Sequence, residues 1–241
     1  MVVVAAGWQL FLHDTAEPAT VNDAVRRFRQ DAMAATERER PGLVPGVYVY
    51  ATSGSEKVDA LGGTRHDYPA RTTITVTRGG CGWKLRWEGL KTRSTTWERC
   101  STSKGDVVRT TRETHRFFGT TQHTDYACGS TLERPAGDPV GKTWPFRCTT
   151  DGSTQKGAGR VVGRGLLSVG GARVAFVHVR WETVLVGKTS GTSEQDEWLD
   201  RASGLPLRII LASETTTGSL IGDVHYQERV DLRLTSLLPR R

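Results

Sequence analysis

Six histidines of this chain could act as bases or metal ligands, but their spacing matches no known metal-binding or catalytic motif. They are His13, His66, His115, His123, His178 and His225. A metal site of ordinary spacing places two ligands on one helix or strand face, as HExxH or HxH does, and neither pattern occurs. We therefore expect no metal ion and no cofactor, and interpret the histidines as surface or hydrogen-bonded side chains.

Nucleophilic catalysis has no motif of its own in the sequence. There is no GxSxG, and no cysteine lies near a histidine. Glycine pairs at 62–63, 79–80 and 170–171 lie between predicted strands, where they indicate hairpin turns rather than phosphate-binding loops. We expect no enzyme and no catalytic residue. The alternative is an unrecognised hydrolase, which would require His115, His123 and Asp125 to converge in one cleft.

Four cysteines indicate disulfide bonds. Cys81 and Cys100 are 19 residues apart, and Cys128 and Cys148 are 20 apart, so each pair would close one local β excursion. No CxxC pair suggests zinc or redox chemistry. Disulfides persist in oxidising compartments. We therefore predict the pairs 81–100 and 128–148 and a location outside the cytosol, and the alternative is four free buried thiols.

The charge of the chain does not predict nucleic-acid binding. Its formal net charge is +7, and a basic surface attracts nucleic acids or anionic lipids. However, the arginines are dispersed, and only residues 26–29 form a dense group. No nucleic-acid motif accompanies them. The preference for arginine over lysine is typical of a GC-rich, bacterial genome.

The N-terminal run is apolar and uncharged. Residues 1–12, MVVVAAGWQLFL, are too few to span a bilayer, which takes about 20 residues. We interpret residues 1–13 as the C-terminal part of a membrane anchor, with Trp8 and His13 at the outer interface. This predicts attachment to the extracytoplasmic face of the cell membrane. The alternative is a buried segment of the domain.

Two further regions follow. Residues 14–46 are predicted to be a linker and an amphipathic helix, which begins at Thr20 and extends to about residue 36. Its apolar stripe is formed by Val21, Ala24, Val25, Phe28 and Ala32. Residues 47–238 are predicted to form a single antiparallel β domain with the two disulfides, because short β-type runs alternate with Gly, Ser, Thr and Asp.

The stretch from Arg71 to Cys100 is predicted to organise the β domain. Ile74 and Val76 alternate with threonines, and Trp83, Leu85 and Trp87 alternate with charged residues, which is typical of half-buried antiparallel strands. Residues 119–145, 151–159 and 188–193 are interpreted as irregular or loop segments. Residues 172–181, apolar on both faces, are predicted to be the central strand.

This order of elements resembles the half-open barrel carriers of the LolA/LolB-like and LppX/LprG-like families. The closing runs WLDRASGLPLRIILASE and IGDVHYQERVDLRLTSL are similar to theirs, and GVYVYATSGSEKVDALGGTRHDYPARTTITVTRGGCGWKLRWE is similar to uncharacterised actinobacterial membrane-anchored proteins. The resemblance covers roughly residues 20–238. It implies a mainly β (α+β) fold, a curved antiparallel sheet or half-open β-barrel of about ten strands with an N-terminal helix. This chain lacks a lipobox cysteine, which favours a fixed anchor.

The sequence therefore predicts a non-catalytic, membrane-anchored extracytoplasmic domain that binds an apolar, lipid-like ligand or an envelope protein. The mechanism would be burial of acyl surface in a cavity. A structural or sensory β module with a filled core is the alternative, and a cavity above about 300 Å³ would distinguish the two. The residues expected to line the cavity are Ile74, Val76, Trp83, Leu85, Trp87, Val177 and Ile209.

Overall fold

The computed structural model describes residues 16–33, 42–59, 63–117, 120–219 and 222–241. The predicted anchor, residues 1–13, lies outside these ranges. Within them, no helix combines the length and the apolar character needed to cross a membrane.

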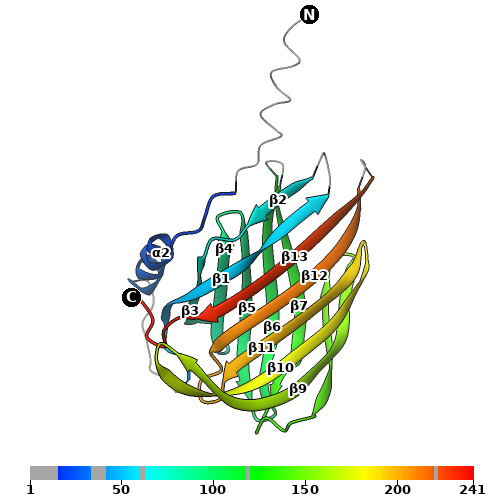
Figure 1. Cartoon of the computed structure of the whole chain (residues 1–241). Coiled ribbons are helices and arrows are strands. Elements are labelled where there is room, and N and C mark those ends of the chain that lie inside the picture. The colour runs from blue at the N-terminus through cyan, green and yellow to red at the C-terminus, as the bar shows by residue number, and fades with distance from the viewer. Residues whose placement is uncertain (1–15, 34–41, 60–62, 118–119, 220–221) are drawn as a thin grey trace, which may run out of the picture.

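The described residues form one antiparallel sheet that closes into a barrel (Figure 1). Its order is β13-β12-β11-β10-β9-β8-β7-β6-β5-β4-β3-β1-β2, and β13 also pairs with β1 over ten residue positions. Twelve strands therefore complete the ring, and β2 is an extra strand that pairs with β1 beyond the end of β3. The strands are β1 (Gly46–Asp59), β2 (Thr64–Asp67), β3 (Arg71–Arg78), β4 (Trp83–Leu90), β5 (Arg93–Thr102), β6 (Gly105–Phe117), β7 (Thr120–Pro135), β8 (Thr143–Thr150), β9 (Ser153–Val169), β10 (Ala172–Gly187), β11 (Thr189–Asp200), β12 (Pro206–Ser219) and β13 (Gly222–Leu234).

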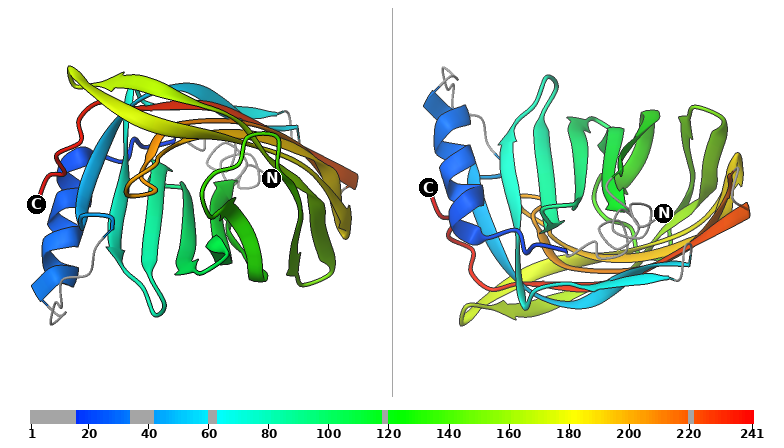
Figure 2. Two further views of the ribbon diagram at one scale, coloured as in Figure 1. Left: turned by 90° about the horizontal axis from the view of Figure 1, so that it is seen from below. Right: turned by 90° about the horizontal axis from the view of Figure 1, so that it is seen from above.

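The turns gather at two ends of the barrel, because neighbouring strands run in opposite directions. One end, which we call the floor, carries the turns that precede β4, β6, β8, β10 and β12. The other end, the mouth, carries the turns that precede β5, β9 and β11. Figure 2 shows the barrel from these two ends.

The largest apolar core occupies mainly the floor half of the barrel. Tyr50, Leu85, Leu207 and Leu232 are among its members and are at most 2% exposed. The reason is visible along β12, where the alternate inward positions change from leucine and isoleucine near the floor to serine and threonine near the mouth. The floor half is therefore packed, and the mouth half has a polar inner surface.

The helix α2 (Val21–Met33) packs on the outside of the barrel against β1 and β3 (Figure 1). It begins where the sequence predicts. The backbone N–H of Asp23 donates to the Thr20 hydroxyl, which in turn donates to the Asp23 carboxylate, so Thr20 caps the first turn of the helix. Ala24 and Phe28 form a small buried cluster with Val47 of β1.

The contact between β7 and β8 is the weakest join between neighbouring strands of the described barrel. It has one ladder pair, Ala127 with Thr149, whereas every other join has at least four. The Cys128–Cys148 disulfide lies next to that pair. Cys81–Cys100 joins the β3–β4 turn to β5. The predicted disulfides are thus present. One of them supports a join that has a single ladder pair and otherwise depends on side-chain hydrogen bonds, from Thr131 to the Arg147 carbonyl and from Trp144 to the Leu132 carbonyl.

The closed ring corrects the prediction of a half-open barrel of about ten strands. Residues expected to be irregular belong to long strands: 120–135 form β7, 153–159 begin β9, and 189–193 begin β11. Near the mouth these strands have polar residues on both faces, since their inner side lines a cavity, so their sequence reads as loop. Residues 172–181, which were expected to form the central strand, belong to β10. In a closed ring every strand has two neighbours, so no strand is central.

Candidate functional site

The mouth half of the barrel contains a cavity of about 1050 Å³. Its wall takes residues from β4 to β13 and from the mouth end of β1. At the mouth it reaches Asp151 and Lys188, in the turns before β9 and β11, whose side chains are fully and 70% exposed. The cavity is thus continuous with solvent at the mouth and ends on the packed core toward the floor.

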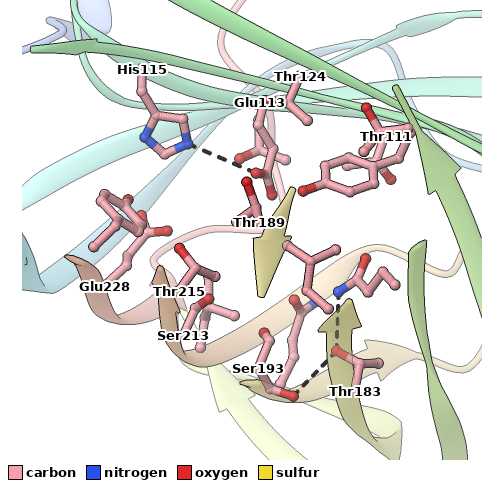
Figure 3. Close-up of a pocket in the computed structure, with 18 of the residues that line it drawn as sticks. Thr111, Glu113, His115, Thr124, Thr183, Thr189, Ser193, Ser213, Thr215 and Glu228 are labelled. Carbon is pink, nitrogen blue, oxygen red and sulfur yellow. Dashed lines mark hydrogen bonds and ion pairs between the residues drawn. The ribbon is translucent and has the colours of Figure 1, made fainter. Parts of the chain in front are cut away.

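The lining combines aromatic and aliphatic groups with hydroxyl groups. The deeper apolar groups include Trp87, Trp97, Trp181, Ile209 and Leu211. The hydroxyl groups follow from alternation, because every second residue of a strand faces inward. They are Thr183 on β10, Thr189 and Ser193 on β11, and Ser213, Thr215 and Thr217 on β12. In Figure 3, Thr183, Ser193, Ser213 and Thr215 lie on the opposite side of the view from Glu113 and His115.

A buried ion pair crosses the barrel interior. Arg93 on β5 donates to both carboxylate oxygens of Glu228 on β13, Nε to Oε1 at 3.0 Å and Nη2 to Oε2 at 2.8 Å. Both residues are 2% exposed. The Tyr68 hydroxyl also donates to Glu228, and Arg93 donates to the Thr95 hydroxyl. Since β4, β3 and β1 lie between β5 and β13 in the ring, this pair ties together two parts of the wall that are not adjacent.

A second group of charged residues joins the extra strand to the wall. Glu56 on β1 lies 3.1 Å from His66 Nδ1 and 3.6 Å from His115 Nδ1, and accepts a hydrogen bond from the Tyr226 hydroxyl. Burial alone would raise the pKa of Glu56. His115, His66 and Arg93 outweigh burial and lower that pKa to about 2.

His115, Glu113 and Tyr226 line the cavity, and Figure 3 shows His115 and Glu113 facing it. Glu113 lies 3.8 Å from His115 Nε2. Burial and Arg93 oppose protonation of His115, but Glu113 and Glu56 raise its pKa above the usual value. Burial opposes ionisation of Glu113, but His115 and Arg93 lower its pKa, so its carboxylate is charged at neutral pH.

A third group lies deeper, where one arginine serves two carboxylates. Arg99 Nη2 lies 2.7 Å from Glu133 and 3.1 Å from Glu197, and all three residues are at most 6% exposed. Burial raises the pKa of Glu133 to about 8, against the opposing effect of Arg99 and together with the repulsion of Glu197 and Asp106. One arginine does not neutralise two buried carboxylates, so Glu133 holds a proton at neutral pH.

The structure separates the seven residues expected to line a cavity. Trp87 and Ile209 line it. Ile74, Val76, Trp83 and Leu85 belong to the large floor core. Val177 belongs to a second buried cluster with Val161 and Val179.

The three residues of the alternative hydrolase do not converge. His115 points into the cavity, whereas Asp125 pairs with Arg112 at exposed positions on the outer surface of β6 and β7. His123 contacts the Thr114 hydroxyl at 3.0 Å and lies at the rim of the cavity, which reaches it near the mouth. Among the described residues, no group of three His, Cys, Asp or Glu side chains is arranged to hold a metal ion.

The sequence reasoning missed the charged and hydroxyl-bearing residues of the wall. One signal was present: Glu113, His115 and Phe117 alternate along β6, as Ser213, Thr215 and Thr217 do along β12. Alternation of polar residues indicates a strand with a polar face, but it does not say whether that face is inside or outside. Only closure of the ring places it inside.

Comparisons with known proteins add little to this geometry. No protein-family model and no curated protein matches the chain. Among solved structures, it is similar to the crystal structure of the hypothetical lipoprotein YmcC from Escherichia coli (K12). The identity is 10%, the match covers 90% of this chain and 98% of that chain, and the TM-score is 0.34. A likeness of this size carries no argument about function, and the resemblance to the LolA/LolB-like and LppX/LprG-like families stays a prediction.

Proposed function

We propose that this barrel binds one small amphiphilic molecule in its mouth cavity, without catalysis. The observation that carries the proposal is the cavity itself. Its volume of about 1050 Å³ lies at the upper end of the range for small-molecule sites, about 300–1,000 Å³. A filled structural or sensory module would need no such space.

The lining supports an amphiphile rather than a purely apolar molecule. Indole rings and aliphatic side chains would take up an alkyl portion, at about 25 cal/mol for each Å² of apolar surface removed from water. Hydroxyl groups nearer the mouth would hydrogen-bond a polar portion. The ligand proposed from the sequence was lipid-like and apolar. Because half of the wall is polar, we propose that the ligand also carries a polar head group.

The proposed setting is the extracytoplasmic face of a membrane. Two disulfides support an oxidising compartment, and the apolar run of residues 1–12 supports an anchor. Binding of an envelope protein stays a second possibility from the sequence, and no feature of the described surface favours it.

Calorimetric titration with decanol, below its solubility limit, tests the proposal. The wild-type protein is expected to bind decanol saturably at one molecule per chain. The Ser213→Trp variant, which places an indole in the cavity, is expected to lose binding.

Glu214→Trp is the matched control, because Glu214 is the next residue of β12, and its side chain is 58% exposed on the outside. It is expected to bind decanol as the wild type does. An absence of saturable binding to the wild type, or equal binding by Ser213→Trp, would contradict the proposal.

A further inference from the structure

The inner charge of the barrel differs from that of the chain as a whole. The chain has a formal net charge of +7, yet its interior is rich in carboxylates. Two guanidinium groups and two imidazoles lie among five carboxylates in or directly behind the cavity wall. The carboxylates are those of Glu56, Glu113, Glu133, Glu197 and Glu228, and the other groups are those of Arg93, Arg99, His66 and His115.

Most of these charges neutralise one another. Glu228 is paired with Arg93 and Glu197 with Arg99, while Glu133 is protonated at neutral pH. Glu56 and Glu113 then share His115, which lies 3.6 Å and 3.8 Å from them, and Glu56 has His66 as well. The carboxylate left with the weakest compensation is Glu113.

Glu113 is also the carboxylate that the cavity can use. It faces the lumen from β6 (Figure 3), and its side chain is 33% exposed there, whereas those of Glu56 and Glu228 are at most 2% exposed. Its distance of 3.8 Å to His115 Nε2 exceeds that of a hydrogen bond. Among the described residues its one ion-pair partner is His115, so an enclosed, ionised carboxylate with a single partner faces the cavity.

Two aromatic rings lie one step deeper than this carboxylate. Thr111 is the next inward residue of β6, and it is flanked by Trp97 of β5 and Tyr126 of β7 in the ladder. Both rings line the cavity. Two residues along a strand span about 7 Å, and a cation is attracted to a ring face within about 6 Å. A cation that lies between Glu113 and this pair of rings is therefore within reach of both the carboxylate and a ring face.

We propose that the ligand of the mouth cavity is a cationic amphiphile, an alkyl or aryl ammonium compound whose positive group binds Glu113 and whose apolar part lies against Trp97, Ile209 and Leu211. The inference rests on the proposed function and names the ligand class of the same site. It accounts for the excess of inward carboxylate, which is costly to enclose without a partner. A fatty acid would instead bring a second negative charge to this wall.

Three decyl compounds that differ only in the head group test the inference at neutral pH. Competition against a bound neutral naphthylamine dye gives the affinity of each. Decylammonium is expected to bind the wild-type protein at least about tenfold more tightly than decanol, and decanoate more weakly than decanol.

The Glu113→Gln variant keeps the shape of the side chain and removes its charge. It is expected to lose the preference for decylammonium while binding decanol as before, which also shows that the variant is folded. Glu182→Gln, at an exposed position on β10, is the control and is expected to keep the preference.

The outcomes separate this inference from the proposed function. If decanol does not bind the wild-type protein, the proposed function fails, and the inference that rests on it fails with it. If decanol binds but decylammonium binds no better, if decanoate binds best, or if Glu113→Gln retains the preference for decylammonium, the inference is wrong and the amphiphile-binding function stands.

Discussion

Removal of Arg93 is expected to destabilise the barrel far more than removal of a surface arginine with the same geometry. In the Arg93→Met variant, Glu228 would be left 2% exposed with only the Tyr68 hydroxyl as a described donor. Breaking a buried ion pair from one side costs about 3–5 kcal/mol, because an uncompensated charge stays enclosed. A barrel of this size has about 5–15 kcal/mol in total, so the loss is large.

Arg208 and Asp231 form the matched control. Their fork has nearly the same distances, 3.0 Å from Nε to Oδ1 and 2.8 Å from Nη2 to Oδ2, but their side chains are 28% and 22% exposed. The Arg208→Met variant is expected to cost at most about 1 kcal/mol, as pairs in contact with solvent do. Asp231 also keeps Arg233 as a partner, 2.8 Å away, so the difference between the two variants measures burial together with the loss of the last charged partner.

The assay is equilibrium unfolding in urea, followed by tryptophan fluorescence. The double variant Arg93→Met, Glu228→Leu removes both charges and is expected to recover most of the loss, because replacement of a whole buried pair by apolar residues is often neutral. A loss below about 1 kcal/mol in Arg93→Met, or a double variant as unstable as the single one, would refute this reasoning.

Two further predictions concern pH and the disulfides. Because the folded pKa of Glu133 is raised from 4.5 to about 8, the folded state binds more protons than the unfolded state in that window, and stability is expected to fall as pH rises from about 4.5 to about 8. Glu133→Gln, measured by urea unfolding at several pH values, is expected to reduce this slope, and an unchanged slope would contradict the assignment. The remaining slope has the same sign, since the raised pKa of His115 contributes stability that is lost as pH rises through it. The Cys128→Ser, Cys148→Ser variant is expected to lose about 3 kcal/mol and to show faster amide hydrogen exchange along β7 and β8 than Cys81→Ser, Cys100→Ser does. Equal exchange in the two variants would mean that the β7–β8 join does not depend on its disulfide.

The fold was predictable where one side of a strand is buried in an apolar core. Ile74, Leu85 and Trp87 alternate with polar residues, and all three are at most 2% exposed. The cysteine spacing likewise predicted pairs that the structure contains. In both cases residues that are close in the sequence form the structure that their spacing predicts.

Closure of the ring was not predictable from such patterns. It depends on the ladder between β1 and β13, from Tyr50–Leu234 to Asp59–His225, which joins the two ends of the domain. Nothing local in either strand says that the other is its partner. The site depends on the same closure. Glu113 and Ser213 belong to strand faces with alternating polar residues, and these faces point inward only because the ring closes.

If the barrel acts as proposed, a small amphiphile occupies its mouth cavity. This occupancy is tested most directly by quenching of tryptophan fluorescence with a terminally brominated decanol, since Trp87, Trp97 and Trp181 line the cavity. We expect quenching that saturates, is reversed by unlabelled decanol, and is lost in Ser213→Trp but retained in Glu214→Trp. Quenching that never saturates, or that is equal in both variants, would contradict the proposed function.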